Sequence, residues 1–378
     1  MPRPRRASIA AILTGGLLLS VLVVSPVSAH DRSHHHGPSV AVIASGLDNP
    51  RGIAVSASGT VLVAEAGSGG DSPGGFGLTG RVISISHGDV HTVINHLPSA
   101  VSPEGEVTGP TNVASRWGRI SVTIGGGPQV IDPRFDTLLG SRPHGVRIVA
   151  DIQAYRDAHQ DGTDLDDPPN PTDSNAYGLD TTWSGTLVTD AAGNELDLVN
   201  WWGHTVTVAK FPNEVMDTGH IPGFPGPRAL PGESVPTTVA VGPDGYWYVG
   251  ELKGFPFAPG ASKVWRIAPW ARNVVCDPAA TSGPCTVFAD GFTSITGLDF
   301  GPDGSLYVVE IVKNGVLGLF DGSDTTGALW RVKHGVRTEL IPGQLTAPGD
   351  VAVARDGTIY VTNKSVLIGG GEVIRIRP

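Results

Sequence analysis

Five polar residues end a recurring apolar stretch of this sequence, and their side-chain oxygens would suit a hard cation. They are Glu65, Asp190, Glu251, Glu310 and Asn363. Calcium prefers carboxylate and amide oxygens gathered around one point, so these residues are candidates for a Ca-type metal site. A residue that recurs at one place in each repeat is also typical of a brace, whose side chain accepts N–H bonds from a neighbouring strand. The sequence favours bracing and leaves the metal role open.

A second polar set stands at the start of the same stretches and offers groups that could bind a small-molecule ligand. It consists of Arg51, Asn112, Tyr177, Thr237 and Asp350. Tryptophans are a further source of ligand contacts, as sugar-stacking platforms, although burial between strands accounts for most of them in an all-β fold. These are Trp201, Trp202, Trp265, Trp270 and Trp330.

Two aspartates break the repeated pattern. Asp180 and Asp299 occupy a place that alanine fills in the other copies, at Ala54, Ala114, Ala240 and Ala352. If these carboxyls reach a central channel, they would bind a cation or share a proton. A hydrogen-bonded structural role is the alternative.

Signatures of a known catalytic centre are absent from the sequence. We find no H-E-x-x-H zinc motif and no phosphate-binding loop. The catalytic residues are therefore unknown, and the sequence leans toward a protein that is not an enzyme.

The stretches that carry these residues are copies of one pattern. "NPRGIAVSASGTVLVAE" (49–65), "VPTTVAVGPDGYWYVGE" (235–251), "SITGLDFGPDGSLYVVE" (294–310) and "APGDVAVARDGTIYVTN" (347–363) align without a gap, and 109–124 and 175–190 align with one deletion. Each copy reads as two strands joined by a glycine-containing turn, followed by two further strands. Six copies, 53 to 66 residues apart, predict an all-β fold, a six-bladed β-propeller with four strands per blade.

The two ends of the repeat array predict how the ring closes. The last copy supplies three strands before Pro378, whereas residues 39–47 ("SVAVIASGL") supply one spare strand. We expect this N-terminal strand to complete the last blade, because closure removes the open edges of the array. Residues 39–378 are thus predicted to form a single propeller domain.

Long loops are confined to one face of the predicted ring. They span 66–80, 252–262, 312–327 and 364–371 within blades, and 151–174 and 212–234 between blades. Binding residues concentrate on loops held by a rigid scaffold, so we expect a small ligand or an envelope protein to bind this face. The segment "DIQAYRDAHQ" (151–160), with Asp157 and His159, is the preferred place for contacts with a partner.

Charge and the first residues indicate where the protein works. The net charge of −10, with no basic run after residue 6, argues against a nucleic-acid partner. A basic head, an apolar run and small residues at Val27 and Ala29 predict a signal peptide over 1–29, followed by a flexible His-containing leader over 30–38.

An uncleaved membrane anchor is the alternative to a signal peptide. After cleavage no apolar segment is long enough to span a membrane, so we expect a secreted protein, extracellular or in the cell envelope. In that oxidising setting Cys276 and Cys285 are predicted to form a local disulfide.

The repeats also resemble a known family. "SGLDNPRGIAV", "VLVAEAGSGG", "TGPTNVA" and "SVTIGGG", followed by an acidic segment before "NAYGLD", resemble the ScyD/ScyE-type secreted proteins. The resemblance covers nearly the whole chain after the signal peptide, and it implies an exported six-bladed propeller of the NHL/gluconolactonase-like kind. It implies no activity, because the family is named for a gene neighbourhood.

Two functions from different classes follow. The favoured one is an exported, non-catalytic propeller that binds a small ligand or an extracellular partner on the long-loop face. The alternative is a Ca-dependent propeller enzyme, such as a lactonase or a sugar oxidoreductase, with carboxylates gathered around a central ion. A module that only fills space in the envelope is a third interpretation.

Overall fold

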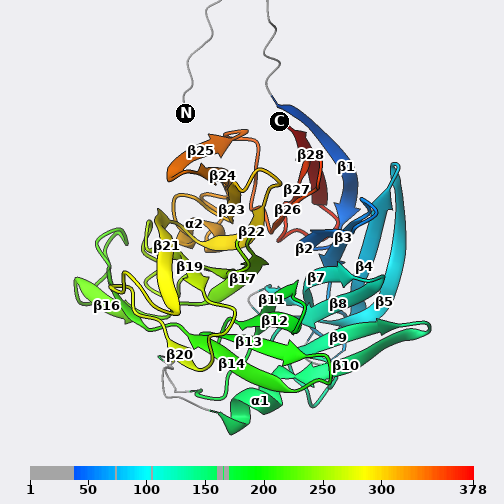
Figure 1. Cartoon of the computed structure of the whole chain (residues 1–378), viewed down its shortest axis with the longest axis horizontal. Coiled ribbons are helices and arrows are strands. Elements are labelled where there is room, and N and C mark those ends of the chain that lie inside the picture. The colour runs from blue at the N-terminus through cyan, green and yellow to red at the C-terminus, as the bar shows by residue number, and fades with distance from the viewer. Residues whose placement is uncertain (1–37, 73–74, 104, 160–164, 166–169) are drawn as a thin grey trace, which may run out of the picture. The chain divides into compact units, whose positions relative to one another are not determined.

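Six small sheets are arranged in a ring, and a two-stranded hairpin forms a seventh sheet outside it (Figure 1). In this computed structural model the described residues are 38–378, except 73–74, 104, 160–164 and 166–169. The predicted signal peptide (1–29) and all but the last residue of the leader (30–38) lie outside these ranges. The six sheets confirm the predicted six-bladed β-propeller.

The strands of each blade follow one another from the channel outward. Blade 1 consists of β2 (Pro50–Val55), β3 (Val61–Glu65), β4 (Gly77–Ser86) and β5 (Asp89–Val101), with β6 (Val107–Thr108) paired to the end of β5. Blade 2 consists of β7 (Pro110–Arg116), β8 (Arg119–Ile124), β9 (Thr137–Arg142) and β10 (Gly145–Asp151). Blade 3 consists of β11 (Ala176–Thr181), β12 (Gly185–Asp190), β13 (Glu195–Asn200) and β14 (Thr205–Lys210).

The remaining three blades repeat this order. Blade 4 consists of β17 (Pro236–Val241), β18 (Trp247–Glu251), β19 (Ser262–Ile267) and β21 (Cys285–Phe292). Blade 5 consists of β22 (Ile295–Phe300), β23 (Leu306–Glu310), β24 (Ala328–Lys333) and β25 (Val336–Leu340). Blade 6 consists of β26 (Val351–Val353), β27 (Ile359–Asn363), β28 (Gly371–Arg377) and, from the other end of the sequence, β1 (Ser39–Leu47).

The closing strand lies where the repeat count predicts it. β1 pairs antiparallel with β28, from Ser39 opposite Arg377 to Leu47 opposite Gly371. Leu47 is 3% exposed and packs with Ile53 and Val63 of blade 1. The N-terminal strand therefore completes blade 6 and also contributes to its packing against blade 1.

Each blade begins with an innermost segment, and the third residue of that segment is alternately glycine and a polar residue around the ring. The count starts at Pro50, Pro110, Ala176, Pro236, Ile295 and Pro348. Blades 1, 3 and 5 have Gly52, Gly178 and Gly297 there, and blades 2, 4 and 6 have Asn112, Thr238 and Asp350. Each glycine faces the polar residue of the next blade. A Cβ on Gly52 would lie 2.4 Å from Cα of Asn112, and one on Gly297 would lie 2.5 Å from Oδ1 of Asp350. Neighbouring blades therefore interlock at this level of the channel.

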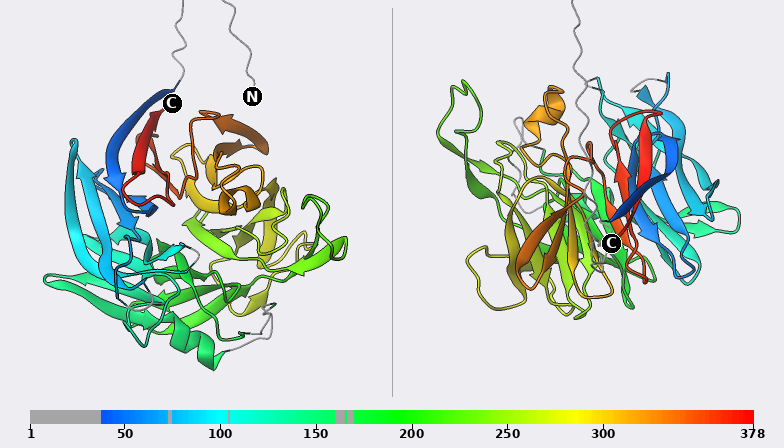
Figure 2. Two further views of the ribbon diagram at one scale, coloured as in Figure 1. Left: turned by 180° about the vertical axis from the view of Figure 1, so that it is seen from behind. Right: turned by 90° about the horizontal axis from the view of Figure 1, so that it is seen from above.

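The elements outside the blades lie in the longer connections. α1 (Ile152–Ala158) and the hairpin of β15 (Glu214–Asp217) and β16 (Ala229–Gly232) lie between blades, and α2 (Leu317–Phe320) lies between β23 and β24. The hairpin and α2 project from the same side of the ring (Figure 2, right), which is the long-loop face. No helix among the described residues is long and apolar enough to cross a membrane.

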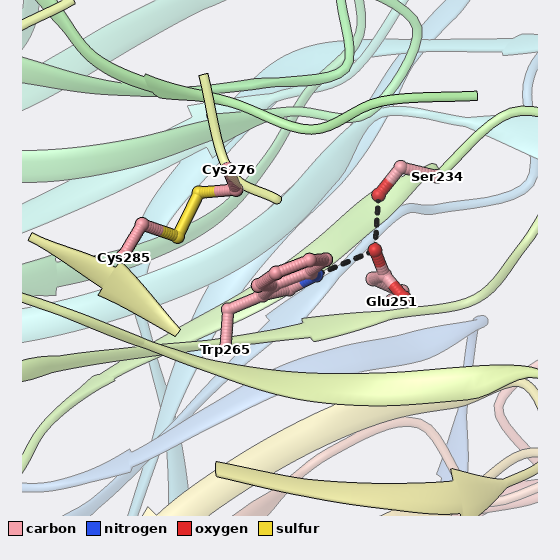
Figure 3. Close-up of a disulfide and its surroundings, with 5 residues drawn as sticks. All are labelled: Ser234, Glu251, Trp265, Cys276 and Cys285. Carbon is pink, nitrogen blue, oxygen red and sulfur yellow. Dashed lines mark hydrogen bonds between the residues drawn. A yellow bond between two sulfur atoms is a disulfide. The ribbon is translucent and has the colours of Figure 1, made fainter. Parts of the chain in front are cut away.

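The predicted disulfide between Cys276 and Cys285 is present (Figure 3). It closes the connection from β19 to β21, and both cysteines are buried in the cluster that contains Phe211 and Trp265. Within this connection β20 (Val274–Val275) pairs in parallel with β14. The disulfide loop of blade 4 is thus attached to the outer edge of blade 3.

Candidate functional site

The innermost strands enclose a cavity of about 240 Å³ in the central channel. All six blades contribute to its lining, with residues between the third and sixth positions of each innermost segment. No Lys, Arg or His side chain belongs to the lining. These positions lead into the short turns, so the cavity lies toward the face opposite the long loops.

Asp180 and Asp299, the two residues that break the repeat pattern, face this cavity from blades 3 and 5. Each carboxylate accepts a backbone N–H from the residue that follows it and another from the next blade. The second bond comes from Val241 to Asp180 at 2.8 Å, and from Val353 to Asp299 at 2.6 Å. Both residues are partly exposed. The two aspartates therefore connect blades and line the channel cavity.

Asp350 lies deeper and joins three blades. It is 5% exposed, and its Oδ2 accepts the N–H of Ile53 at 3.1 Å and the side-chain amide of Asn112 at 3.4 Å. Asn112 and Asp350 both line the cavity. The structure thus brings together two of the five predicted ligand-binding residues.

The other three predicted ligand-binding residues do not line the cavity. Arg51, Tyr177 and Thr237 occupy the second position, where a bulge interrupts the pairing of the innermost strand. Nη1 of Arg51 donates to the Tyr177 hydroxyl at 3.1 Å, and the Thr237 hydroxyl donates to the carbonyl of Ile295 at 2.6 Å. These side chains make bonds between blades, at the long-loop end of the innermost strands.

Thr238 is a cavity residue that the sequence analysis missed. Its hydroxyl oxygen accepts the N–H of Leu298 from blade 5 at 3.2 Å, which is the bridging role that the aspartates have elsewhere. The available signal was the alternation of glycine with polar residues at the third position.

Burial raises the pKa of all three channel carboxyls. The pKa of Asp299 rises to about 7 because of burial and, in addition, the nearby charge of Asp180. Burial also raises the pKa of Asp180 and of Asp350. A carboxyl group that is partly protonated at neutral pH can donate as well as accept hydrogen bonds. The cavity therefore suits a ligand that is rich in hydroxyl groups.

The metal candidates act as hydrogen-bond acceptors within the fold; they are Glu65, Asp190, Glu251, Glu310 and Asn363. Four of them accept the backbone N–H of the segment that enters their blade, at Asp48, Asn175, Thr293 and Thr346, over 2.7–2.8 Å. Glu251 instead accepts hydrogen bonds from the Ser234 hydroxyl and the Trp265 indole, both at 2.6 Å (Figure 3). None of the five lines the channel cavity.

A bound cation would need several of these carboxylates close together. Among the residues that the structure describes, no group of three or more His, Cys, Asp or Glu is placed to hold a metal ion. The channel aspartates have their oxygens directed at backbone N–H groups, and burial favours their protonated form, which raises their pKa. The predicted carboxylates are therefore not gathered around one point among the residues that the structure describes.

The segment predicted for partner contacts lies outside the channel, on α1. Asp157 accepts a bond from the Gln153 side chain at 2.9 Å, and the His159 ring stacks on Tyr155 with centroids 4.2 Å apart. Asp157 and His159 are exposed, and Gln160 falls outside the described residues. The segment does not contribute to the cavity.

Comparison with known proteins supports the fold. No protein-family description matches the chain, and no curated protein matches it. Among solved structures, it is similar to a protein assigned as an oxidoreductase (glucose dehydrogenase) from Thermus thermophilus, with 18% identity, a TM-score of 0.52, and 90% and 100% of the two chains covered. The apo aldose sugar dehydrogenase of Escherichia coli gives 14% identity, a TM-score of 0.52, and 90% and 99% coverage.

A third solved neighbour contains a cofactor. The PQQ-bound aldose sugar dehydrogenase of Streptomyces coelicolor gives 13% identity, a TM-score of 0.51, and 90% and 98% coverage. PQQ is itself a polycarboxylate, whereas the cavity lining contains Asp180, Asp299 and Asp350 and no Lys, Arg or His. The lining therefore offers no cation to pair with the carboxylates of this cofactor, and the channel residues do not fit it. At these identities the three neighbours establish a shared β-propeller fold and nothing further.

Proposed function

We propose that this chain binds a small, neutral, hydroxyl-rich ligand in its channel cavity. The observation that carries the proposal is the placement of Asp180 and Asp299 in the cavity lining without any basic side chain. A volume of about 240 Å³ is below the roughly 300 Å³ at which typical ligand pockets begin, which limits the ligand to about the size of a monosaccharide. Because two structural neighbours are aldose sugar dehydrogenases, an aldose is the first ligand to test.

Isothermal titration with glucose, its δ-lactone and the gluconate anion tests this proposal. We expect the neutral compounds to bind and gluconate to bind at least tenfold more weakly, because its carboxylate would meet the channel carboxyls. Asp299→Asn should weaken binding of the neutral compounds about tenfold. Asp303→Asn is the matched control, since Asp303 lies in the exposed turn after β22 of the same blade. Equal affinities in Asp299→Asn and the wild type would contradict the proposal.

Acid–base catalysis is a second candidate, favoured by the pKa of Asp299. A carboxyl group with a pKa of about 7 can donate and accept a proton at neutral pH, as hydrolysis of a lactone requires. This version of the predicted enzyme needs no calcium. Lactone hydrolysis that is abolished in Asp299→Asn and retained in Asp303→Asn would support a catalytic role. Binding without turnover would contradict that role and leave ligand binding as the only function supported.

We also propose that the chain is exported and belongs with the ScyD/ScyE-type proteins. The apolar run before Ala29 and the quoted repeat segments support this assignment. Mass spectrometry of protein recovered from the culture medium or the envelope tests export, because cleavage after Ala29 would leave His30 as the first residue. Retention of the intact chain in the cytoplasm would contradict it.

A further inference from the structure

Four exposed tryptophans gather on the short-turn face, over blades 2 and 3. Trp117, Trp183 and Trp202 are 76%, 79% and 83% exposed, and Trp201 is 41% exposed. They occupy the turns that join β7 to β8, β11 to β12 and β13 to β14. These are half of the eight tryptophans of the chain. Indole rings left in water to this extent, and clustered, mark an interaction surface.

The rings are held in contact with one another. The centroids of Trp117 and Trp201 are 5.7 Å apart, and Nε1 of Trp201 donates to the carbonyl of Trp183 at 2.8 Å. The guanidinium of Arg116 lies 4.5 Å from the centre of the Trp117 ring. The three turns therefore form one continuous platform whose arrangement exists before any partner binds.

The charge around these rings is opposite to that of the whole chain. The three turns and the neighbouring turn from β9 to β10, with the strand ends that flank them, contain Arg116, Arg119, Arg142, His144 and His204, and no Asp or Glu. The chain as a whole has a net charge of −10. The corresponding first turns of blades 4, 5 and 6 contain Asp244, Asp303 and Asp356 instead. A basic, aromatic surface is thus confined to one side of an acidic molecule.

We propose that this tryptophan patch, defined as Trp117, Trp183, Trp201 and Trp202 with Arg116, Arg119 and Arg142, docks the propeller on an anionic lipid bilayer. Indole rings prefer the headgroup region, where their apolar body and polar N–H are both accommodated. Arginines next to them interact with lipid phosphates. Both kinds of side chain are present here on the exposed tips of turns.

The geometry favours a bilayer over a polysaccharide. A sugar ring needs an open aromatic face, but Arg116 lies over one face of Trp117, and Trp201 is more than half buried with its N–H already bonded to the carbonyl of Trp183. The tips of several turns can enter the surface of a bilayer without an open face on each ring. None of the patch residues lines the channel cavity, so this inference does not depend on the ligand proposed for the cavity.

Sedimentation with vesicles tests the docking surface. The full chain is mixed with vesicles of phosphatidylcholine alone or of phosphatidylcholine with phosphatidylglycerol, and with vesicles that contain brominated lipid. We expect stronger binding to the anionic vesicles than to the neutral ones, with quenching of tryptophan fluorescence by the brominated lipid. Trp183→Ala with Trp202→Ala should lower the partition coefficient at least tenfold and remove most of the quenching. Arg119→Gln and Arg142→Gln should each lower it roughly fivefold.

Phe320→Ala is the matched control, because Phe320 is 58% exposed on α2, on the opposite face. It should bind vesicles like the wild type, and the chain's own N-terminal apolar run contributes equally in all variants. Unquenched tryptophans, or equal partition of the double tryptophan variant and the wild type, would overturn the proposal. Binding to an acidic polysaccharide without vesicle binding, or a dimer that Trp202→Ala dissociates, would overturn it in favour of those partners.

Discussion

One residue type at one place in the repeat can lie in quite different surroundings. Glu251 is fully buried and accepts bonds from Ser234 and Trp265, and it also lies 3.0 Å from Nζ of Lys253. Glu310 accepts the backbone N–H of Thr293, and burial raises its pKa. The sequence predicts the position of both glutamates. It does not predict that a lysine side chain, that of Lys253, lies against Glu251.

This difference predicts unequal costs for removing the two charges. Glu251→Gln should lower the free energy of unfolding by about 2 kcal/mol, because the side chain of Lys253, 1% exposed, loses one of its two carboxylate partners and keeps Glu214. Glu310→Gln should cost about 1 kcal/mol, since it removes no buried ion pair and weakens one hydrogen bond. Denaturation in guanidinium chloride measures both, and equal losses would contradict the distinction.

Asp299 is predicted to make the protein less stable as the pH rises. Its pKa in the folded protein is about 7, above the value of about 3.9 for an unfolded aspartate. The folded state therefore holds an extra proton between these values, and the free energy of unfolding falls as the pH rises from about 4 to about 7. Asp299→Asn cannot ionise, so urea melts across this range should show a flatter dependence on pH.

Asp303→Asn provides a control of opposite sign. Hydrogen bonding from Lys333 and other groups lowers the pKa of Asp303, so its charge stabilises the fold above about pH 4 and this contribution is lost as the pH falls further. The variant should be less stable than the wild type at pH 7 and approach it toward about pH 3. A wild-type slope in Asp299→Asn would show that the channel carboxyl is not responsible.

At the scale of elements, the bulge in the innermost strands decides which residues face the channel. Strict alternation would place residues two apart on one face. A bulge adds one residue and breaks that period, as it does at the second position in blades 1, 3 and 4. Arg51, Tyr177 and Thr237 could therefore not be oriented from the sequence, whereas Asp180 and Asp299, beyond the bulge, could.

The connection from β19 to β21 depends on its disulfide. Cys276 and Cys285 are 9 residues apart, and the N–H of Cys276 donates to the carbonyl of Lys210 in β14 at 2.9 Å. Replacing both cysteines by alanine should lower the free energy of unfolding by about 3 kcal/mol, from the loop entropy that the bond removes. Guanidinium denaturation measures the loss. The wild type under reducing conditions should match the variant, and no difference between the oxidised and reduced protein would contradict this role.

For the whole molecule, the repeat period and the spare strand at 39–47 predicted the ring and its closure. The sequence did not predict the cavity toward the short-turn face, because which end of a channel is filled depends on contacts between residues far apart in the chain. Arg51 and Tyr177 meet across 126 positions, and Asn112 and Asp350 across 238. Such pairs follow from the ring and cannot be derived from any one repeat.

The interlock of glycine with polar residues predicts that the ring is sensitive to a single methyl group. Gly52→Ala would place its Cβ 2.4 Å from the backbone Cα of Asn112, so blades 1 and 2 would have to move apart. We expect a loss of about 2 kcal/mol or more. Gly254→Ala is the control, since its Cβ would lie 3.3 Å from the nearest atom. A thermal melt that is the same for both variants would contradict the interlock.

Ring closure predicts that the N-terminal strand is required for the stability of the whole propeller. Deleting residues 39–47 removes every bond between β1 and β28 and exposes the edge of β28 and the cluster of Ile53 and Val63. An uncovered strand edge is also prone to pairing with other chains. We expect the truncated chain to melt at least about 10 °C lower or to aggregate, as followed by circular dichroism and light scattering. Deletion of residues 30–37 alone should leave the melt unchanged, and an unchanged melt after removal of 39–47 would mean that the ring does not depend on its closing strand.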